Sequence, residues 1–175
     1  MKRILSWVVL AGMISWGSGS AFAQNAICVL NPTQGNQVKG TVQFFQKKGY
    51  VLVKAKIEGL APGKHGFHIH ESGDCSAPDA SSAKGHFNPG NHHHGGPYAH
   101  EKHAGDLGNL KANSKGEAVY EHKYKTLRLS GENSIVGKAI IVHQKEDDYK
   151  TQPTGNAGAR VACGVIESKE ETPKK

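Results

Sequence analysis

The chain is dominated by short segments in which hydrophobic and polar residues alternate with a period of two. Residues 38–44 and 51–58 show this pattern most clearly, and Lys48-Gly49 between them is a turn signal. Alternation places every second side chain on the same face of a strand, so each segment would bury one face. The two segments therefore predict a β-hairpin with one face in the core.

Further strand candidates follow along the chain, and no window carries a helix-period apolar stripe of ten or more residues. Besides the hairpin, the candidates are residues 27–30, 64–70, 117–124, 126–129, 135–143 and 160–166. About eight short strands separated by turn signals are typical of an antiparallel sandwich or barrel. We therefore expect an all-β fold, an eight-stranded antiparallel barrel or flattened sandwich.

Two segments have little strand character, residues 72–116 and residues 144–159. Loops beyond about 12 to 15 residues are uncommon in compact domains unless they are functional or cross-linked. One segment follows His70 and the other follows His143. If both leave the same side of the sheet, they would wall a common site.

The N-terminus has the pattern of a secretory signal peptide. Lys2 and Arg3 precede an apolar stretch over residues 4–14, and Ala21-Phe22-Ala23 is a small-residue cleavage signal. A retained membrane anchor would need about 20 apolar residues, and residues 17–20 interrupt this stretch. We expect residues 1–23 to be a signal peptide, residues 24–175 to form one domain, and residues 168–175 to be a flexible tail.

The charge of the chain is basic but dispersed. The formal net charge is +7 at pH 7, and removal of Lys2 and Arg3 with the leader leaves +5. A mildly basic surface attracts small anions as readily as nucleic acid. Because no basic motif with interleaved aromatic residues is present, we expect no nucleic-acid partner. We also expect no membrane association once the leader is removed.

The three cysteines fit an oxidising compartment with one disulfide and one remaining thiol. Cys28 lies in the apolar run of residues 27–30, which favours a small buried side chain. By elimination Cys75 pairs with Cys163. Such a bond would pin the start of the 72–116 segment to a strand near the end of the chain.

Eight of the eleven histidines lie between Gly66 and Asp106. Imidazole nitrogens and carboxylate oxygens are the ligands that copper and zinc take from proteins. His68 and His70 are two residues apart on a predicted strand, so both would point to the same face and converge on one ion. This stretch therefore predicts a metal site.

Several motifs closely resemble the Cu/Zn superoxide dismutases, and the resemblance covers nearly the whole chain after residue 23. The motifs, in order, are Gly66-Phe67-His68-Ile69-His70-Glu71, Gly85-His86-Phe87-Asn88-Pro89, His94-Gly95-Gly96-Pro97, His103-Ala104-Gly105-Asp106-Leu107-Gly108-Asn109, Gly155-Asn156-Ala157-Gly158-Ala159-Arg160 and Ala162-Cys163-Gly164-Val165. Six pieces in the same order are a specific match. The resemblance implies an eight-stranded Greek-key barrel, copper and zinc as cofactors, and superoxide as substrate.

The resemblance also implies roles for individual residues. The copper ligands would be His68, His70, His86 and His143, and the zinc ligands would be His86, His94, His103 and Asp106. Asp147 would link ligands of the two metals through hydrogen bonds. Arg160 would attract and dock the anionic substrate, and His86, as the bridge between the metals, would share the catalytic role.

The leader, the spacing between Cys75 and His86 and the short segment 144–159 resemble the exported bacterial branch of the family, which implies a periplasmic location. Both a homodimer and a monomer stay open. An alternative function is an exported copper- or zinc-binding carrier on the same fold without turnover. A carrier needs no anion-docking arginine, so Arg160 favours the enzyme.

Five histidines have no expected ligand role. His65 has the wrong strand parity to join His68 and His70, and we expect it to be a hydrogen-bonded structural residue. The other four, expected at the surface, are His92, His93, His100 and His122. An offset by one residue within the tract His92–His94 stays open as an alternative.

Overall fold

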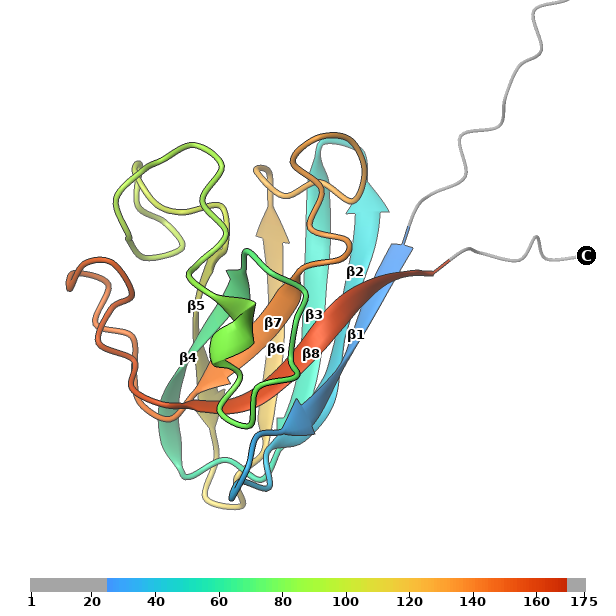
Figure 1. Cartoon of the computed structure of the whole chain (residues 1–175). Coiled ribbons are helices and arrows are strands. Elements are labelled where there is room, and N and C mark those ends of the chain that lie inside the picture. Colours follow the sequence, from blue (N-terminus) through green and yellow to red (C-terminus); the bar gives the residue numbers. More distant parts are fainter. Residues whose placement is uncertain (1–24, 170–175) are drawn as a thin grey trace, which may run out of the picture.

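Eight β-strands and one short 3-10 helix make up the part of the chain that the computed structural model describes, residues 25–169 (Figure 1). The elements are β1 (Asn25–Pro32), β2 (Lys39–Lys47), β3 (Tyr50–Glu58), β4 (Gly63–His70), η1 (Ser81–Ala83), β5 (Asp106–Ala112), β6 (Ala118–Tyr124), β7 (Ala139–His143) and β8 (Arg160–Lys169). The predicted signal peptide, residues 1–23, lies outside the described residues. No helix within residues 25–169 is long and apolar enough to cross a membrane.

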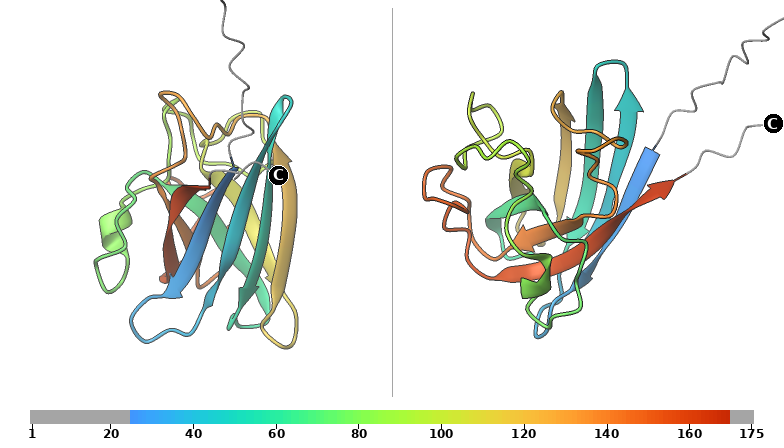
Figure 2. Two further views of the ribbon diagram at one scale, coloured as in Figure 1. Left: turned by 90° about the vertical axis from the view of Figure 1, so that its right-hand side faces the viewer. Right: turned by 45° about the horizontal axis from the view of Figure 1, so that its top comes forward.

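The strands form one antiparallel sheet that curls into a nearly closed barrel (Figures 1 and 2). The order across the sheet is β5-β4-β7-β8-β1-β2-β3-β6. After β3 the chain crosses to the other end of the sheet order, where β4 lies. Later strands then pair with earlier ones, β6 with β3 and β7 with β4. The predicted all-β, eight-stranded antiparallel fold is confirmed.

Alternation of burial explains the first half of the barrel. In β3 the exposed or half-buried residues alternate with Val51, Val53, Ala55 and Ile57, all of which are buried. The predicted hairpin is β2 and β3, joined by the turn at Lys48-Gly49. The inward residues of these strands pack around Phe44 and other apolar side chains of the barrel interior, where burial supplies most of the favourable free energy of folding.

β7 differs because all five of its residues are buried. One face of β7 lies toward the barrel interior, and the other is covered by the segment that carries η1. A small apolar cluster forms there from Ala80 and Ala83 of this segment, Ala139 and Ile141 of β7, and Cys163 of β8. A disulfide joins Cys75 to Cys163, with a Cα–Cα distance of 5.9 Å. The continuous apolar run of β7 therefore reflects cover on both sides.

The strand predictions were wrong in three places. Residues 126–129 do not form a strand, although Leu127 and Leu129 are both buried. The predicted strand at 135–143 begins only at Ala139. The 72–116 segment was taken as a loop throughout, yet it contains β5. One false strand and one missed strand cancel, which is why the predicted number agreed with the structure.

The predicted tail also begins too early. Ser168 and Lys169 belong to β8, where they pair with Ala26 and Asn25 of β1. Residues 170–175 of this tail lie outside the described residues.

The two long segments leave opposite ends of the β4–β7 pair rather than the same end. These strands are antiparallel, with His70 opposite Ala139 and Phe67 opposite Val142. The segments nevertheless meet, because the Gln152 side chain accepts a hydrogen bond from the backbone N–H of His94 at 2.8 Å and donates one to its carbonyl at 2.9 Å. They converge over the outer face of the barrel, which is where the predicted site would lie.

The free thiol of Cys28 allows a direct test of the core. Cys28 is fully buried in β1, and burial, with a contribution from Glu167, raises the pKa of its thiol to about 12. Because the thiolate is the reactive form, we expect the native protein to show no thiol that reacts with a disulfide reagent at pH 8. In denaturant, one thiol per chain should react.

The same shift has a consequence for stability. The pKa of Cys28 in the folded state lies above its unfolded value of about 8.5. The neutral thiol therefore contributes fully to the free energy of unfolding below about pH 8.5, and this contribution declines as the pH rises toward about 12. In the thiol-reagent test, equal reaction rates of Cys28 in the native and the denatured protein at pH 8 would contradict its burial in the core.

Candidate metal centre

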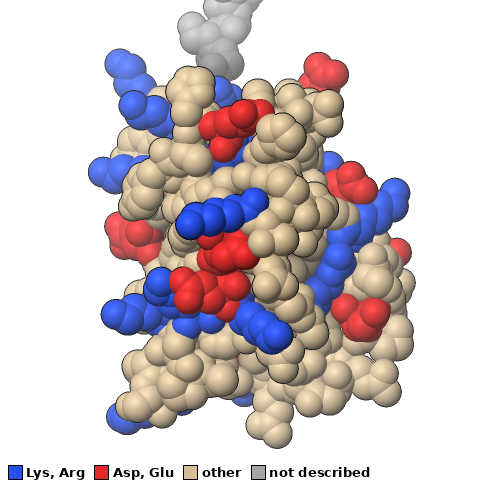
Figure 3. All heavy atoms as spheres, turned by 90° about the vertical axis from the view of Figure 1, so that its left-hand side faces the viewer, with Lys and Arg blue, Asp and Glu red and all other residues tan. Residues whose placement is uncertain are grey.

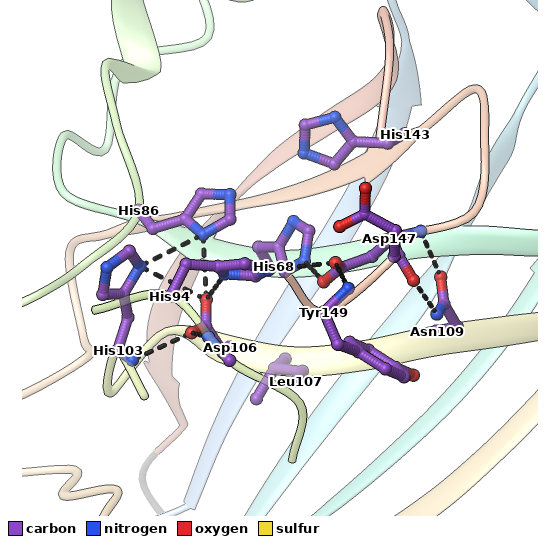
Figure 4. Close-up of polar contacts among 12 residues, drawn as sticks. His68, His86, His94, His103, Asp106, Leu107, Asn109, His143, Asp147 and Tyr149 are labelled. Atoms are coloured by element: carbon purple, nitrogen blue, oxygen red, sulfur yellow. Dashed lines mark hydrogen bonds and ion pairs between the residues drawn. The ribbon is translucent and has the colours of Figure 1, made fainter. Parts of the chain in front are cut away.

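Four buried histidines converge on the outer face of the barrel. Figure 4 shows three of them, His68, His86 and His143. His68 and His70 come from β4, His143 ends β7, and His86 follows η1 and forms an isolated bridge with His70. One ligand atom from each lies within 4.8 Å of every other. The strand period explains the first two, since residues i and i+2 share a face.

Each of these four rings has one nitrogen with no hydrogen-bond partner. The unpartnered atoms are His68 Nδ1, His70 Nε2, His86 Nε2 and His143 Nε2. The other nitrogen of His70 lies 2.8 Å from the Lys84 carbonyl oxygen, and that of His143 lies 3.2 Å from the Gly158 carbonyl oxygen. A carbonyl only accepts, so both Nδ1 atoms carry the proton and both Nε2 atoms present lone pairs. These lone pairs suit a metal ion, and the four buried nitrogens fit copper.

Burial keeps three of these imidazoles neutral, those of His70, His86 and His143. It lowers the pKa of His70 and of His143 well below the usual range, and the neighbouring imidazoles lower both further. Burial and the nearby His68 lower the pKa of His86 to about 4, against the opposing effect of Asp106. A neutral imidazole is the form that binds a metal ion, so these three rings need no deprotonation near neutral pH.

A second group lies beside the first and shares His86 with it. It consists of His86, His94, His103 and Asp106, all buried. The Asp106 Oδ1 atom is 2.9 Å from His86 Nδ1, 3.0 Å from His94 Nδ1 and 3.4 Å from His103 Nδ1, and the Nδ1 atoms of His86 and His103 are 3.4 Å apart. Ligands about 2.0 to 2.1 Å from a tetrahedral zinc ion would be roughly 3.3 Å apart. The second group therefore fits a closed zinc site.

Backbone groups hold Asp106 in place. Its Oδ2 atom accepts hydrogen bonds from the N–H groups of His103 at 2.8 Å and Gly95 at 3.1 Å. Burial alone would raise the pKa of the carboxyl group, but hydrogen bonds from His103, His86 and His94 hold this pKa well below its usual range. Asp106 is therefore an anion, which is the form in which a carboxyl group binds a metal ion.

Asp147 connects the two groups. Its Oδ2 atom lies 2.8 Å from His68 Nε2 and its Oδ1 atom 2.9 Å from His94 Nε2. Although burial opposes it, the hydrogen bonds with these two rings hold the pKa of the Asp147 carboxyl below its usual range. A carboxylate behind a metal-binding imidazole fixes the orientation of the ring and raises its basicity.

His94 lies between two carboxylates. Burial would lower its pKa, but the hydrogen bonds and charges of Asp106 and Asp147 outweigh burial and raise the pKa to about 9. The ring is therefore protonated near neutral pH while no metal is bound. Zinc would take the place of the proton at Nδ1, and binding would release it.

Two features around Asp147 could not be read from the sequence pattern. Asn109 on β5 exchanges two hydrogen bonds of 2.9 Å with the Asp147 backbone (Figure 4). Gly155, with φ +69°, lets the chain pass close to the carboxylate, since a Cβ there would lie 1.8 Å from Asp147 Oδ1. Both residues stand in the family-like motifs, which was the only signal for them.

Arg160, at the start of β8, is half-buried and held by two carbonyl groups. Its Nη1 donates to Ala80 at 2.5 Å and its Nη2 to Lys84 at 2.6 Å. The Lys84 carbonyl also accepts from His70, so one oxygen joins the arginine to the copper-type group. Burial lowers the pKa of Arg160 and the charge of Asp79 opposes this. The guanidinium stays charged because its pKa begins above 12.

The remaining histidines take no part in either group. His65 is buried, with Nδ1 at 2.9 Å from the His143 carbonyl and Nε2 at 2.8 Å from the Ala61 carbonyl. It is a hydrogen-bonded structural residue, as predicted. His92, His93 and His100 are exposed as expected. His122 was predicted to be solvated, but it is partly buried, with its ring centroid 4.6 Å from that of Tyr124.

Fold and site together define a class of protein, an eight-stranded β-barrel with a four-histidine site and a three-histidine, one-aspartate site joined by a shared imidazole. The family model for copper/zinc superoxide dismutase matches residues 38–166. The chain belongs to this family of oxidoreductases, and its cofactors are copper and zinc ions.

Relatives with known names agree with this assignment. Superoxide dismutase [Cu-Zn] 2 of Mesembryanthemum crystallinum is 45% identical over 148 residues, covering 81% of this chain and 93% of the relative. Extracellular superoxide dismutase [Cu-Zn] of Brugia pahangi is 42% identical over 150 residues, covering 81% and 74%. The crystal structure of the clock protein EA4 is 40% identical, with a TM-score of 0.77, and the match covers 85% of this chain and 97% of that one.

The close approach at Gly155 gives a test of the link between the two groups. We expect Gly155→Ala to displace the Asp147 carboxylate and weaken zinc binding by about tenfold or more, the usual effect of losing such a hydrogen-bond partner. Chelator competition measures the affinity. Gly35→Ala is a matched control, since Gly35 has φ +78° and no atom within 4 Å of a Cβ. Equal zinc affinities in the two variants would contradict the role given to Asp147.

Proposed function

We propose that this chain dismutes superoxide, converting two superoxide ions and two protons to dioxygen and hydrogen peroxide. The assignment rests on one observation above all, the two buried ligand groups that share His86. Copper would be held by His68, His70, His86 and His143, and zinc by His86, His94, His103 and Asp106. Copper, when bound, supplies the acceptance and return of one electron, which zinc lacks.

His86 would move a proton in this reaction. Its Nε2 atom faces the copper group and its Nδ1 atom faces the zinc group. Nε2 would hold a proton in the reduced half of the cycle and release it toward the departing peroxide in the other half. The buried position and the two-sided ligation of His86 support this role, because they fix the ring while only one nitrogen changes its partner.

Arg160 would dock the substrate. Its guanidinium is fixed by the carbonyl groups of Ala80 and Lys84, so it offers a positive charge without the entropy of a free side chain. Both carbonyl groups belong to the segment that follows Cys75, which the disulfide ties to β8. Figure 3 shows the side of the molecule on which the segment between β7 and β8 lies. On this side, Lys and Arg side chains are interspersed with Asp and Glu side chains and do not gather in one patch.

Replacing the arginine tests the proposal. A unit charge about 6 Å from the substrate, at an effective dielectric constant of about 40, contributes about 1.4 kcal/mol. We therefore expect Arg160→Ile to lower kcat/KM for superoxide about tenfold in stopped-flow assays of the copper- and zinc-loaded protein. Arg128→Ile is the control, because Arg128 also donates to two carbonyl groups but lies outside the site.

The outcome separates the enzyme from the second candidate function. A folded protein that binds both metals but shows no copper-dependent turnover would be an exported metal carrier, as considered from the sequence. If neither Arg160→Ile nor Arg128→Ile changes kcat/KM, the protein is still an enzyme, but Arg160 does not dock the substrate. The fixed guanidinium near the copper group favours the enzyme, since a carrier has no anion to dock.

The protein would act outside the cytoplasm. The disulfide and the similarity to an extracellular relative fit an exported protein. We further propose that residues 1–23 are removed as a signal peptide and that the chain is of the exported bacterial type, located in the periplasm. N-terminal sequencing of the secreted protein should begin at Gln24, and a sequence that begins at Met1 would contradict this processing.

A further inference from the structure

The barrel has an open seam between β5 and β6. These strands stand at the two ends of the sheet order, and in the described part of the chain β5 pairs only with β4 and β6 only with β3. A hairpin turn connects them at one end, where the Asn113 N–H donates to the Glu117 carbonyl at 2.9 Å. Away from this turn, side chains must hold the seam together, because no backbone ladder does so.

A β-bulge lies on β5 beside this seam and next to a zinc-type ligand. Asp106 pairs with His68 and Gly108 with Phe67, so Leu107 has no partner on β4. Gly108 has φ +94°, a conformation that suits glycine. Bulges often redirect a side chain beside a functional site. Here the bulge immediately follows Asp106, the first residue of β5.

Two tyrosines of β6 reach across the seam to the bulge. The hydroxyl groups of Tyr120 and Tyr124 both lie 2.8 Å from the Leu107 carbonyl oxygen, and they also contact each other. Leu107 is fully buried and Tyr124 is 3% exposed. A buried carbonyl left without a donor is unfavourable, so these phenols satisfy a group that the β4 ladder does not.

Lys102 adds a second contact between the tyrosines and the zinc-type group. Its ammonium nitrogen lies 5.6 Å from the centroid of the Tyr124 ring. The same nitrogen lies 3.3 Å from the His103 carbonyl oxygen and 3.4 Å from the Asp106 carbonyl oxygen. The aromatic face of Tyr124 therefore supports a cation that contacts the backbone of two ligands.

We propose that Tyr120 and Tyr124 are positioning residues for zinc. They clamp the bulge at Leu107 across the open seam, and this fixes the direction in which the preceding Asp106 carboxylate points. The inference rests on the proposed role of Asp106 as a zinc ligand. The clamp acts through the backbone and adds to the N–H groups of His103 and Gly95, which hold the carboxylate itself.

The geometry predicts that the two phenols replace each other. Each has one proton, and either can satisfy the Leu107 carbonyl alone. Tyr120→Phe and Tyr124→Phe should each change zinc affinity by less than about twofold, whereas the double variant should lose about tenfold, the usual effect of removing a partner behind a ligand. The two changes should thus be strongly non-additive.

The experiment uses the full mature chain with copper bound. Zinc affinity is measured by chelator competition, and the visible spectrum of Co²⁺ placed in the zinc site reports its tetrahedral geometry. Tyr50→Phe is the control, because the Tyr50 ring contacts Lys123 rather than β5. We expect the cobalt spectrum to change in the double variant only, while the copper spectrum stays that of the wild type.

Several outcomes would overturn the clamp. One is a double variant with the zinc affinity and cobalt spectrum of Tyr50→Phe; another is additive effects of the two single changes. If the double variant does not fold, the single variants decide, since each should keep a zinc affinity within about twofold of Tyr50→Phe, and a tenfold loss in either one would refute the clamp in which the two phenols replace each other. A wild-type chain that binds neither zinc nor Co²⁺ would instead refute the proposed zinc ligands.

Discussion

The structure depends on one constraint, that imidazole nitrogens are buried without hydrogen-bond partners. Four such atoms face the copper group, one from each of its rings. Each unsatisfied buried group costs about 1 to 3 kcal/mol, so four together rival the whole stability of a typical domain, about 5 to 15 kcal/mol. A fold that concentrates them in this way is complete only with metal ions, and metal binding is then part of its folding free energy.

The surrounding hydrogen bonds decide which nitrogen of each ring stays free. Carbonyl oxygens face the Nδ1 atoms of His70 and His143, and a carboxylate faces His68 Nε2. All three acceptors lie outside the strands, and one of them, the Lys84 carbonyl, also accepts from Arg160. The disulfide and η1 therefore do more than cover β7. They fix the carbonyl groups that orient both the His70 ring and the Arg160 guanidinium.

The sequence predicted the hairpin of β2 and β3 because regular alternation there coincides with one buried face. It failed for β5 for a physical reason. Asp106, Leu107 and Leu110 are all fully buried, and the bulge at Leu107 shifts the parity of the strand, so no period of two is visible. It failed in the opposite sense at Leu127 and Leu129, which lie two residues apart and are both buried, in a segment that pairs with no strand. Alternation reports burial, and burial does not require strand pairing.

The site was predicted in a similarly uneven way. The candidate ligand residues could be identified from the sequence because their types and spacing indicate metal binding. The family-like motifs then assigned each of them to one of the two metals. The backbone acceptors at Ala80, Lys84 and Gly158 could not be predicted, since every residue has a carbonyl group and only the path of the chain decides which one meets a side chain. Long-range folding, not local sequence, determines these contacts.

The two ligand sets also show how one protein can separate two metals. Four nitrogens surround the first position, and burial favours the neutral state of two of the rings, those of His70 and His143. Three nitrogens and one carboxylate surround the second, where the negative charge of Asp106 would compensate the charge of a divalent ion. Because His86 belongs to both groups, an ion held at its Nδ1 would favour the deprotonated form of the shared ring. The proton that Nε2 of His86 would hold and release is then one that the zinc-type group helps to control.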